Sequence, residues 1–140
     1  MQADAVKRRE KIESYKKIVL ENRRNDNDRV LEYCHKIIEL ADETGDEDAL
    51  GFAYFYIGEV EYLTNSIDEM FDSMLNALRY LGNSGQWYLA ARVYNVMGIT
   101  SVSRGNTVAA MEYYMSGLYI CEEHDVKSVQ SSIGTISEKC

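Results

Sequence analysis

The sequence predicts an all-α fold in which three helical hairpins follow one another along the chain. The 140 residues include no proline, although average usage would place about seven in a chain of this length. Long helices can therefore run without a break. Turn-forming residues recur every 40 positions. Between these turns, apolar residues follow the three-four spacing of amphipathic helices.

Two kinds of turn signal define the repeat unit. The first is a residue that tolerates the left-handed conformation, followed directly by one that readily caps a new helix. These pairs are Asn25 and Asp26, Asn65 and Ser66, and Gly105 and Asn106. The second turn recurs at Gly45, Gly85 and Asp125. Together they predict repeat units over residues 5–45, 46–85 and 86–125, each made of two helices joined by a short turn.

Each predicted helix carries one apolar stripe. In the first helices, 46–64 and 86–104, the stripes are Leu50, Ala53, Tyr54, Ile57 and Gly58, and then Ala90, Val93, Tyr94, Met97 and Gly98. In the second helices they are Val30, Cys34, Ile37, Ile38 and Ala41, then Met70, Met74, Ala77, Leu78 and Leu81, then Ala110, Tyr114, Gly117, Leu118 and Cys121. A single stripe is too narrow to form a core, so we expect the hairpins to stack as an α-solenoid.

The residues of the second and third units resemble the tetratricopeptide repeat family. The signature positions are Tyr54, Gly58, Ala77, Tyr94, Gly98, Gly105, Ala110, Tyr114 and Gly117. Small residues there would let two antiparallel helices approach closely, with tyrosines filling the space beside them. The period of 40 is longer than the usual 34 and is similar to that of longer bacterial repeats. The first unit has Ile18, Val30 and Ile37 where small residues are expected, so we expect it to cap the array.

The end of the chain predicts one further helix. Ser132, Ile133 and Gly134 repeat the pattern seen around Gly58 and Gly98. We expect a helix over 126–140 that either caps the array or begins a truncated hairpin of a longer one. Residues 91–98 also resemble the N-terminal repeat regions of bacterial signalling proteins that carry a diguanylate cyclase (GGDEF) domain. We therefore expect the chain to be the N-terminal part of a larger protein.

Charge and hydropathy argue against several classes of partner. Residues 1–25 hold eight basic and four acidic residues, whereas the remainder holds seven basic and nineteen acidic ones. An acidic body repels nucleic-acid phosphates and anionic membranes. No stretch has the roughly 20 apolar residues of a membrane helix, and the first residues lack an apolar signal core. We expect a cytoplasmic protein that binds neither nucleic acid nor membrane.

Catalytic and metal-binding patterns are absent from the sequence. Three cysteines without a C-x-x-C spacing do not indicate a zinc site. Cys34 and His35 are adjacent, which on a helix places their side chains about 100° apart rather than facing each other. Glu59 and Glu61 are better explained as acids on solvated helix faces than as a catalytic pair. We predict a non-enzymatic chain with no metal and no cofactor.

The resemblance implies a concave groove lined by the first helix of each unit. Carried onto this sequence, the expected partner-binding residues are Tyr15, Phe52, Phe55, Glu59, Tyr62, Arg92, Asn95 and Ile99. Clustered aromatic residues beside arginine are typical of interface hot spots. Asn95 could clamp a peptide backbone and Arg92 could hold a carboxylate. The alternative is that Phe52 or Phe55 packs on the preceding second helix.

These observations favour a protein- or peptide-binding repeat module that regulates a bacterial signalling protein. A second interpretation is a homo-oligomerisation module, in which the aromatic patch or the exposed terminal helix pairs copies of the chain and no peptide is bound.

Overall fold

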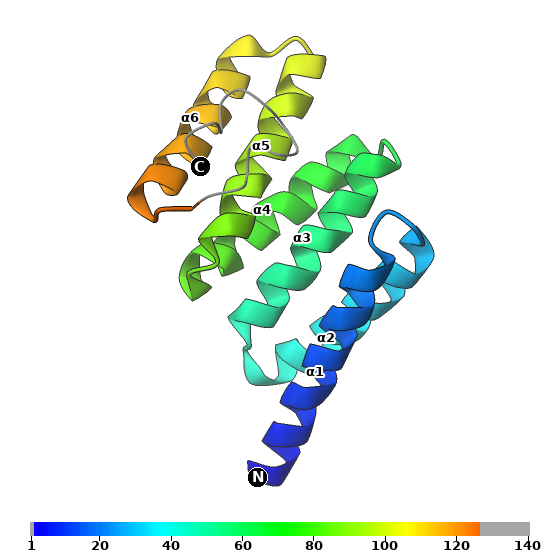
Figure 1. Ribbon diagram of the computed structural model, residues 1–140. Coiled ribbons are helices and arrows are strands. Elements are labelled where there is room, and N and C mark those ends of the chain that lie inside the picture. The colour runs from blue at the N-terminus through cyan, green and yellow to red at the C-terminus, as the bar shows by residue number, and fades with distance from the viewer. Residues whose placement is uncertain (1, 127–140) are drawn as a thin grey trace. The chain divides into compact units, whose positions relative to one another are not determined.

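The computed structural model describes residues 2–126, and all of the regular structure in this part is helical (Figure 1). The helices are α1 (Gln2–Asn22), α2 (Asn27–Thr44), α3 (Glu47–Leu63), α4 (Ile67–Ser84), α5 (Trp87–Ser103) and α6 (Thr107–Glu123). The predicted all-α fold class is confirmed. The helix predicted over 126–140 lies outside the described residues from position 127 onward.

The described part of the chain divides into two compact units, one that ends at residue 80 and one that begins at residue 81. The first unit holds α1, α2, α3 and most of α4. In it, α2 packs against both α1 and α3, and α1 also contacts α3. The second compact unit holds the end of α4 together with α5 and α6. In it, α5 packs against α6.

The helix boundaries repeat with the predicted period. A shift of 40 residues carries Asn27–Thr44 onto Ile67–Ser84 and Glu47–Leu63 onto Trp87–Ser103, with the same first and last positions. The start of α4 is likewise carried onto the start of α6. The spacing of turn residues therefore predicted the local structure of the second and third units correctly.

The second turn of each repeat unit has the same geometry in all three repeats. Gly45, Gly85 and Asp125 have φ values of 67°, 74° and 52°. In each turn the next residue donates its backbone N–H to a carbonyl five positions back, at 3.0–3.1 Å. The donor and acceptor pairs are Asp46 and Ala41, Gln86 and Leu81, and Val126 and Cys121. This bond satisfies a carbonyl that the end of the helix would leave unpaired.

The first turn follows the prediction in two units and departs from it in one. Asn65 and Gly105 are left-handed, with φ values of 63° and 78°. In the first unit the left-handed residue is Arg24, with φ 68°, and not Asn25. There α1 ends at Asn22, one position earlier than the equivalent helices α3 and α5, and the side chain of Asn22 donates to the carbonyl of Ile18 at 2.8 Å.

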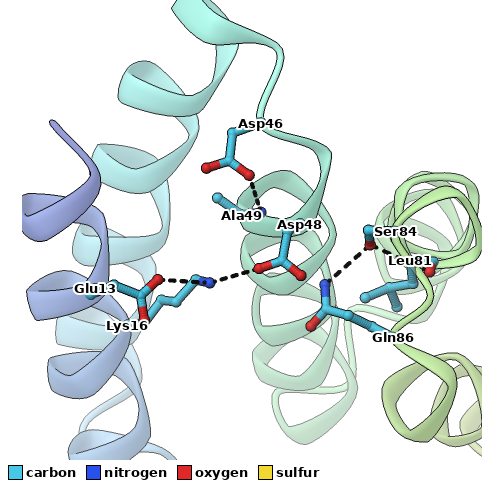
Figure 2. A network of polar contacts seen from close by, with 8 residues as sticks. All are labelled: Glu13, Lys16, Asp46, Asp48, Ala49, Leu81, Ser84 and Gln86. Carbon is cyan, nitrogen blue, oxygen red and sulfur yellow. Dashed lines mark hydrogen bonds and ion pairs between the residues drawn. The ribbon is translucent and has the colours of Figure 1, made fainter. Parts of the chain in front are cut away.

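Side-chain caps start α2 and α6 at two of the predicted cap residues, and a further side-chain cap starts α3. Asp26 accepts from the N–H of Arg29, and Asn106 accepts from the N–H of Ala109, both at 3.1 Å. Asp46 caps α3 through the N–H of Ala49, also at 3.1 Å (Figure 2). Each cap satisfies one of the backbone donors that the first turn of a helix leaves free.

Close contact between paired helices depends on the signature glycines. A Cβ atom built on Gly98 of α5 would stand 2.5 Å from the ring of Tyr114 on α6. In the opposite direction, a Cβ on Gly117 would stand 3.3 Å from the Cβ of Tyr94. The same arrangement occurs 40 residues earlier, where a Cβ on Gly58 would stand 2.9 Å from Met74. The paired helices therefore approach each other closely at these positions.

Candidate interaction surfaces

The first helix of the second repeat is buried on nearly every side. In α3 the buried residues run almost without a gap: Ala49, Leu50, Gly51, Phe52, Ala53, Phe55, Tyr56, Ile57, Gly58, Glu59 and Val60. A helix surrounded in this way serves as a core element and not as an open binding wall.

Two predicted groove aromatics therefore lie in the core. Phe55 has no exposed surface and makes an edge-on contact with the ring of Tyr56, with centroids 4.9 Å apart. Phe52 is 7% exposed, and the ammonium group of Lys16 lies 5.4 Å from its ring centroid. Lys16 belongs to α1, so Phe52 lies beneath the first helix of the preceding unit. This corrects the expectation that Phe52 and Phe55 form an open hot spot.

Lys16 also ties α1 to α3 through charge. Its Nζ lies 3.1 Å from Asp48 on α3 and 3.2 Å from Glu13 on its own helix (Figure 2). Burial acts to lower the pKa of Lys16, but its hydrogen bonds and attraction to Asp48 and Glu13 outweigh burial, so the pKa is raised. The ion pair between Lys16 and Asp48 thus helps to hold the basic helix α1 against α3.

Glu59 forms a buried ion pair and is not a solvated acid. Its side chain is 8% exposed and receives two bonds from Arg23, at 2.9 Å from Nε and 2.7 Å from Nη2. Arg24 adds a longer contact of 3.8 Å to the same carboxylate. Such a two-point arginine contact is the strong form of a salt bridge. Glu59 thus fastens the end of α1 to α3, which corrects the expectation that it lines a groove.

Glu61 faces a different side of α3 from Glu59. It accepts a hydrogen bond of 2.6 Å from the hydroxyl of Ser73 on α4. Burial raises the pKa of Glu61, and the bond from Ser73 opposes that rise. The two glutamates are held by separate partners, so they do not form a pair of cooperating acids.

The predicted polar residues of α5 are also buried. Asn95 is 2% exposed, and its side-chain oxygen lies 3.6 Å from the point where a Cβ on Gly117 would stand. No described residue donates a hydrogen bond to that oxygen. Arg92 is 6% exposed, and its guanidinium lies 5.7 Å from the ring centroid of Tyr88. Asn95 lies against α6, the partner helix of its own hairpin. The prediction that it clamps a peptide backbone is therefore wrong.

Three of the eight predicted groove residues keep accessible surface. Tyr15 is partly exposed and contacts Tyr33 of α2, with ring centroids 5.3 Å apart. Tyr62 of α3 and Ile99 of α5 are also partly exposed. Tyr15 thus lies on the side of α1 that faces α2, so it does not continue the surface expected from α3.

A different surface, absent from the predicted site, is apolar and open. We call it the outer face of α6. It consists of Val108, Met111, Met115 and Tyr119, which are 73%, 51%, 62% and 65% exposed. Beside it, a shallow hollow of about 430 Å³ is lined by Tyr94, Met115, Ser116, Tyr119 and Ile120. Large apolar side chains exposed together in this way mark interaction sites.

The repeat itself shows that the fold does not require apolar residues on this face. The matching positions are Asp68, Phe71, Leu75 and Arg79 in α4, and Asp28, Leu31, His35 and Glu39 in α2. In both earlier helices, three of the four positions are exposed and the other is half-buried. The four equivalent positions thus face solvent in all three helices, and their residues are mostly polar in α2, mixed in α4 and apolar in α6. A comparison of the three units could have found this signal in the sequence.

Other chemistry is limited in the part of the chain that the structure describes. Cys34 is a free thiol with no exposed surface, and burial raises its pKa to about 12. Among residues 2–126, no group of three or more His, Cys, Asp or Glu side chains is placed to hold a metal ion. None of the helices in that range is long and apolar enough to cross a bilayer.

No protein-family model, no curated protein and no solved structure matches this chain.

Proposed function

We propose that this chain is a non-catalytic, protein-binding repeat module of the tetratricopeptide type. It acts as the regulatory part of a larger cytoplasmic bacterial signalling protein, with a diguanylate cyclase as the output domain. The observation that carries the binding role is the outer face of α6. The four equivalent positions lie mostly exposed in α2, α4 and α6. Only in α6 are all four occupied by exposed apolar side chains.

The chemistry of the remaining side chains supports a binding role over a catalytic one. A thiol with a pKa of about 12 is not a nucleophile at neutral pH. The buried carboxylate of Glu59 is neutralised by Arg23 and is closed to a substrate. The outer face of α6 offers apolar area and two methionines. Methionine adapts its shape readily and is common at surfaces that bind protein segments.

A photo-crosslinking amino acid at position 115 tests the binding role in cells that express the full-length protein. Position 35 is the matched control, because His35 is the exposed equivalent in α2. We expect position 115 to form a covalent adduct with a protein and position 35 to form none. Equal labelling from both positions, or no adduct from position 115, would contradict a binding role for this face.

The signalling role is tested separately by reading the gene beyond the codon for Cys140. We expect an open frame that encodes an output domain. A stop codon at that point would contradict this part of the proposal and leave the binding role untouched.

A further inference from the structure

We propose that the outer face of α6 pairs with the same face of a second copy of this chain, with the two helices antiparallel. This inference rests on the protein-binding role proposed above and names the partner. Three features of α6 and the residues beside it support this pairing: the spacing of the apolar residues, the charges at the two ends of the face and the exposed area.

The spacing suits a helix that packs against its own copy. Val108, Met111, Met115 and Tyr119 are separated by three, four and four positions. At about 100° per residue they fall within an arc of roughly 80° along one side of the helix. Paired helices bury a narrow apolar seam of this kind, with side chains of one helix inserted between those of the other. An identical seam on a second copy provides side chains of matching size and spacing.

The charges at the ends of the face favour the antiparallel arrangement. Arg104 precedes α6, and Glu122 continues the outer face near its C-terminal end. If two copies pair antiparallel about a two-fold axis midway between Met111 and Met115, the start of each α6, which Arg104 precedes, lies near the end of the other, which carries Glu122. A parallel pair would instead place like charges together at each end. Opposite charges at the rim of an interface select the register and orientation of the partner.

The area is enough for a reversible dimer. With about 150–250 Å² of surface for a large side chain, the exposed fractions of the four residues amount to roughly 500 Å² on each copy. Two copies would bury roughly 1,000 Å², near the lower end of specific interfaces. We therefore expect self-association that depends on protein concentration, not a permanent dimer.

The first test measures the molecular mass of the full chain in solution by sedimentation equilibrium over a range of concentrations. We expect the mass to rise toward twice the monomer value for the wild type. Met115→Lys should remain monomeric at every concentration. Leu75→Lys is the matched control, since Leu75 is the 53% exposed equivalent in α4, and it should associate like the wild type. Both side chains are exposed, so circular dichroism should show unchanged helical content.

A charge exchange tests the antiparallel register. Arg104→Glu and Glu122→Arg should each weaken self-association by a few-fold, because each places like charges opposite one another at both ends of the seam. The double variant Arg104→Glu with Glu122→Arg restores opposite charges and should recover the wild-type association. Failure of the double variant to recover would overturn the antiparallel arrangement.

The outcomes separate this inference from the proposed function. A wild type that is monomeric at all concentrations, or a dimer that Met115→Lys does not weaken, would overturn the pairing of α6 faces. If position 115 then crosslinks to a different protein, the binding role stands and the second copy is excluded as the occupant. If position 115 crosslinks to nothing and the chain is monomeric, both proposals fail.

Discussion

The contact between Gly98 and Tyr114 predicts a large loss of stability from the smallest substitution, Gly98→Ala. The new methyl carbon would stand 2.5 Å, 2.7 Å and 2.9 Å from three carbons of the tyrosine ring. A ring cannot bend away from such a contact, so either the ring or the whole of α6 has to move. Over-packing of this kind costs about 1–3 kcal/mol and sometimes more.

The repeat supplies an internal control at Gly58, the equivalent position in α3. There the added carbon would stand 2.9 Å from the terminal methyl of Met74, the flexible end of an unbranched side chain. Methionine can adjust its rotamers at small cost, and alanine in a helix is favoured over glycine by about 1 kcal/mol. We therefore expect Gly58→Ala to change stability by less than about 1 kcal/mol, and Gly98→Ala to destabilise by about 1–3 kcal/mol.

The assay is urea denaturation followed by circular dichroism for both single variants and for Gly98→Ala with Tyr114→Met. The double variant pairs an alanine with a methionine, as Gly58→Ala does with Met74, so it should recover much of the loss if the ring is the cause. A Gly98→Ala protein as stable as the wild type would refute the close contact. Equal losses from Gly98→Ala and Gly58→Ala would refute the assignment of the cost to the rigid ring.

Three further outcomes follow from the surroundings of single side chains. Arg23→Ala should reduce the free energy of unfolding by about 2–4 kcal/mol, because it leaves the carboxylate of Glu59 buried without its main partner. A loss below about 0.5 kcal/mol in urea denaturation would count against this ion pair. Cys34 should resist alkylation in the folded chain, as measured by mass spectrometry of its peptide. Its pKa rises from 9.0 to about 12 on folding. The free energy of unfolding should therefore fall as pH increases through that window, by up to about 1.4 kcal/mol per pH unit. His124→Ala should change the fluorescence of Trp87, the only tryptophan in the sequence, because their rings stack with centroids 3.8 Å apart; an unchanged spectrum would contradict this stacking.

The turns and helix boundaries were predictable because their causes are local. A left-handed residue, the residue that caps the next helix and the carbonyls they satisfy all lie within about five positions. Gly45, Gly85 and Asp125 were therefore identified correctly from residue type and spacing. The exception is Arg24, which is left-handed in place of Asn25 where α1 ends one position early; residue type and spacing did not predict this shift.

The candidate site was predicted poorly because exposure is not a local property. Phe55 and Glu59 occupy positions that the family resemblance assigns to an open groove, yet both are buried in this chain. For Glu59, burial depends on Arg23, which lies 36 residues away in the sequence. The spacing of residues along one helix cannot show which of its sides a distant segment covers.

By itself, the sequence determined the all-α class, the 40-residue period and the glycines at which paired helices meet, since turn chemistry and apolar periodicity act over a few residues. Tertiary structure alone decided that α3 is enclosed on nearly every side, that Arg23 neutralises Glu59 and that the apolar outer face of α6 remains open. These outcomes depend on contacts between segments far apart in the chain, where the free energy of burying a side chain is set by its neighbours in space.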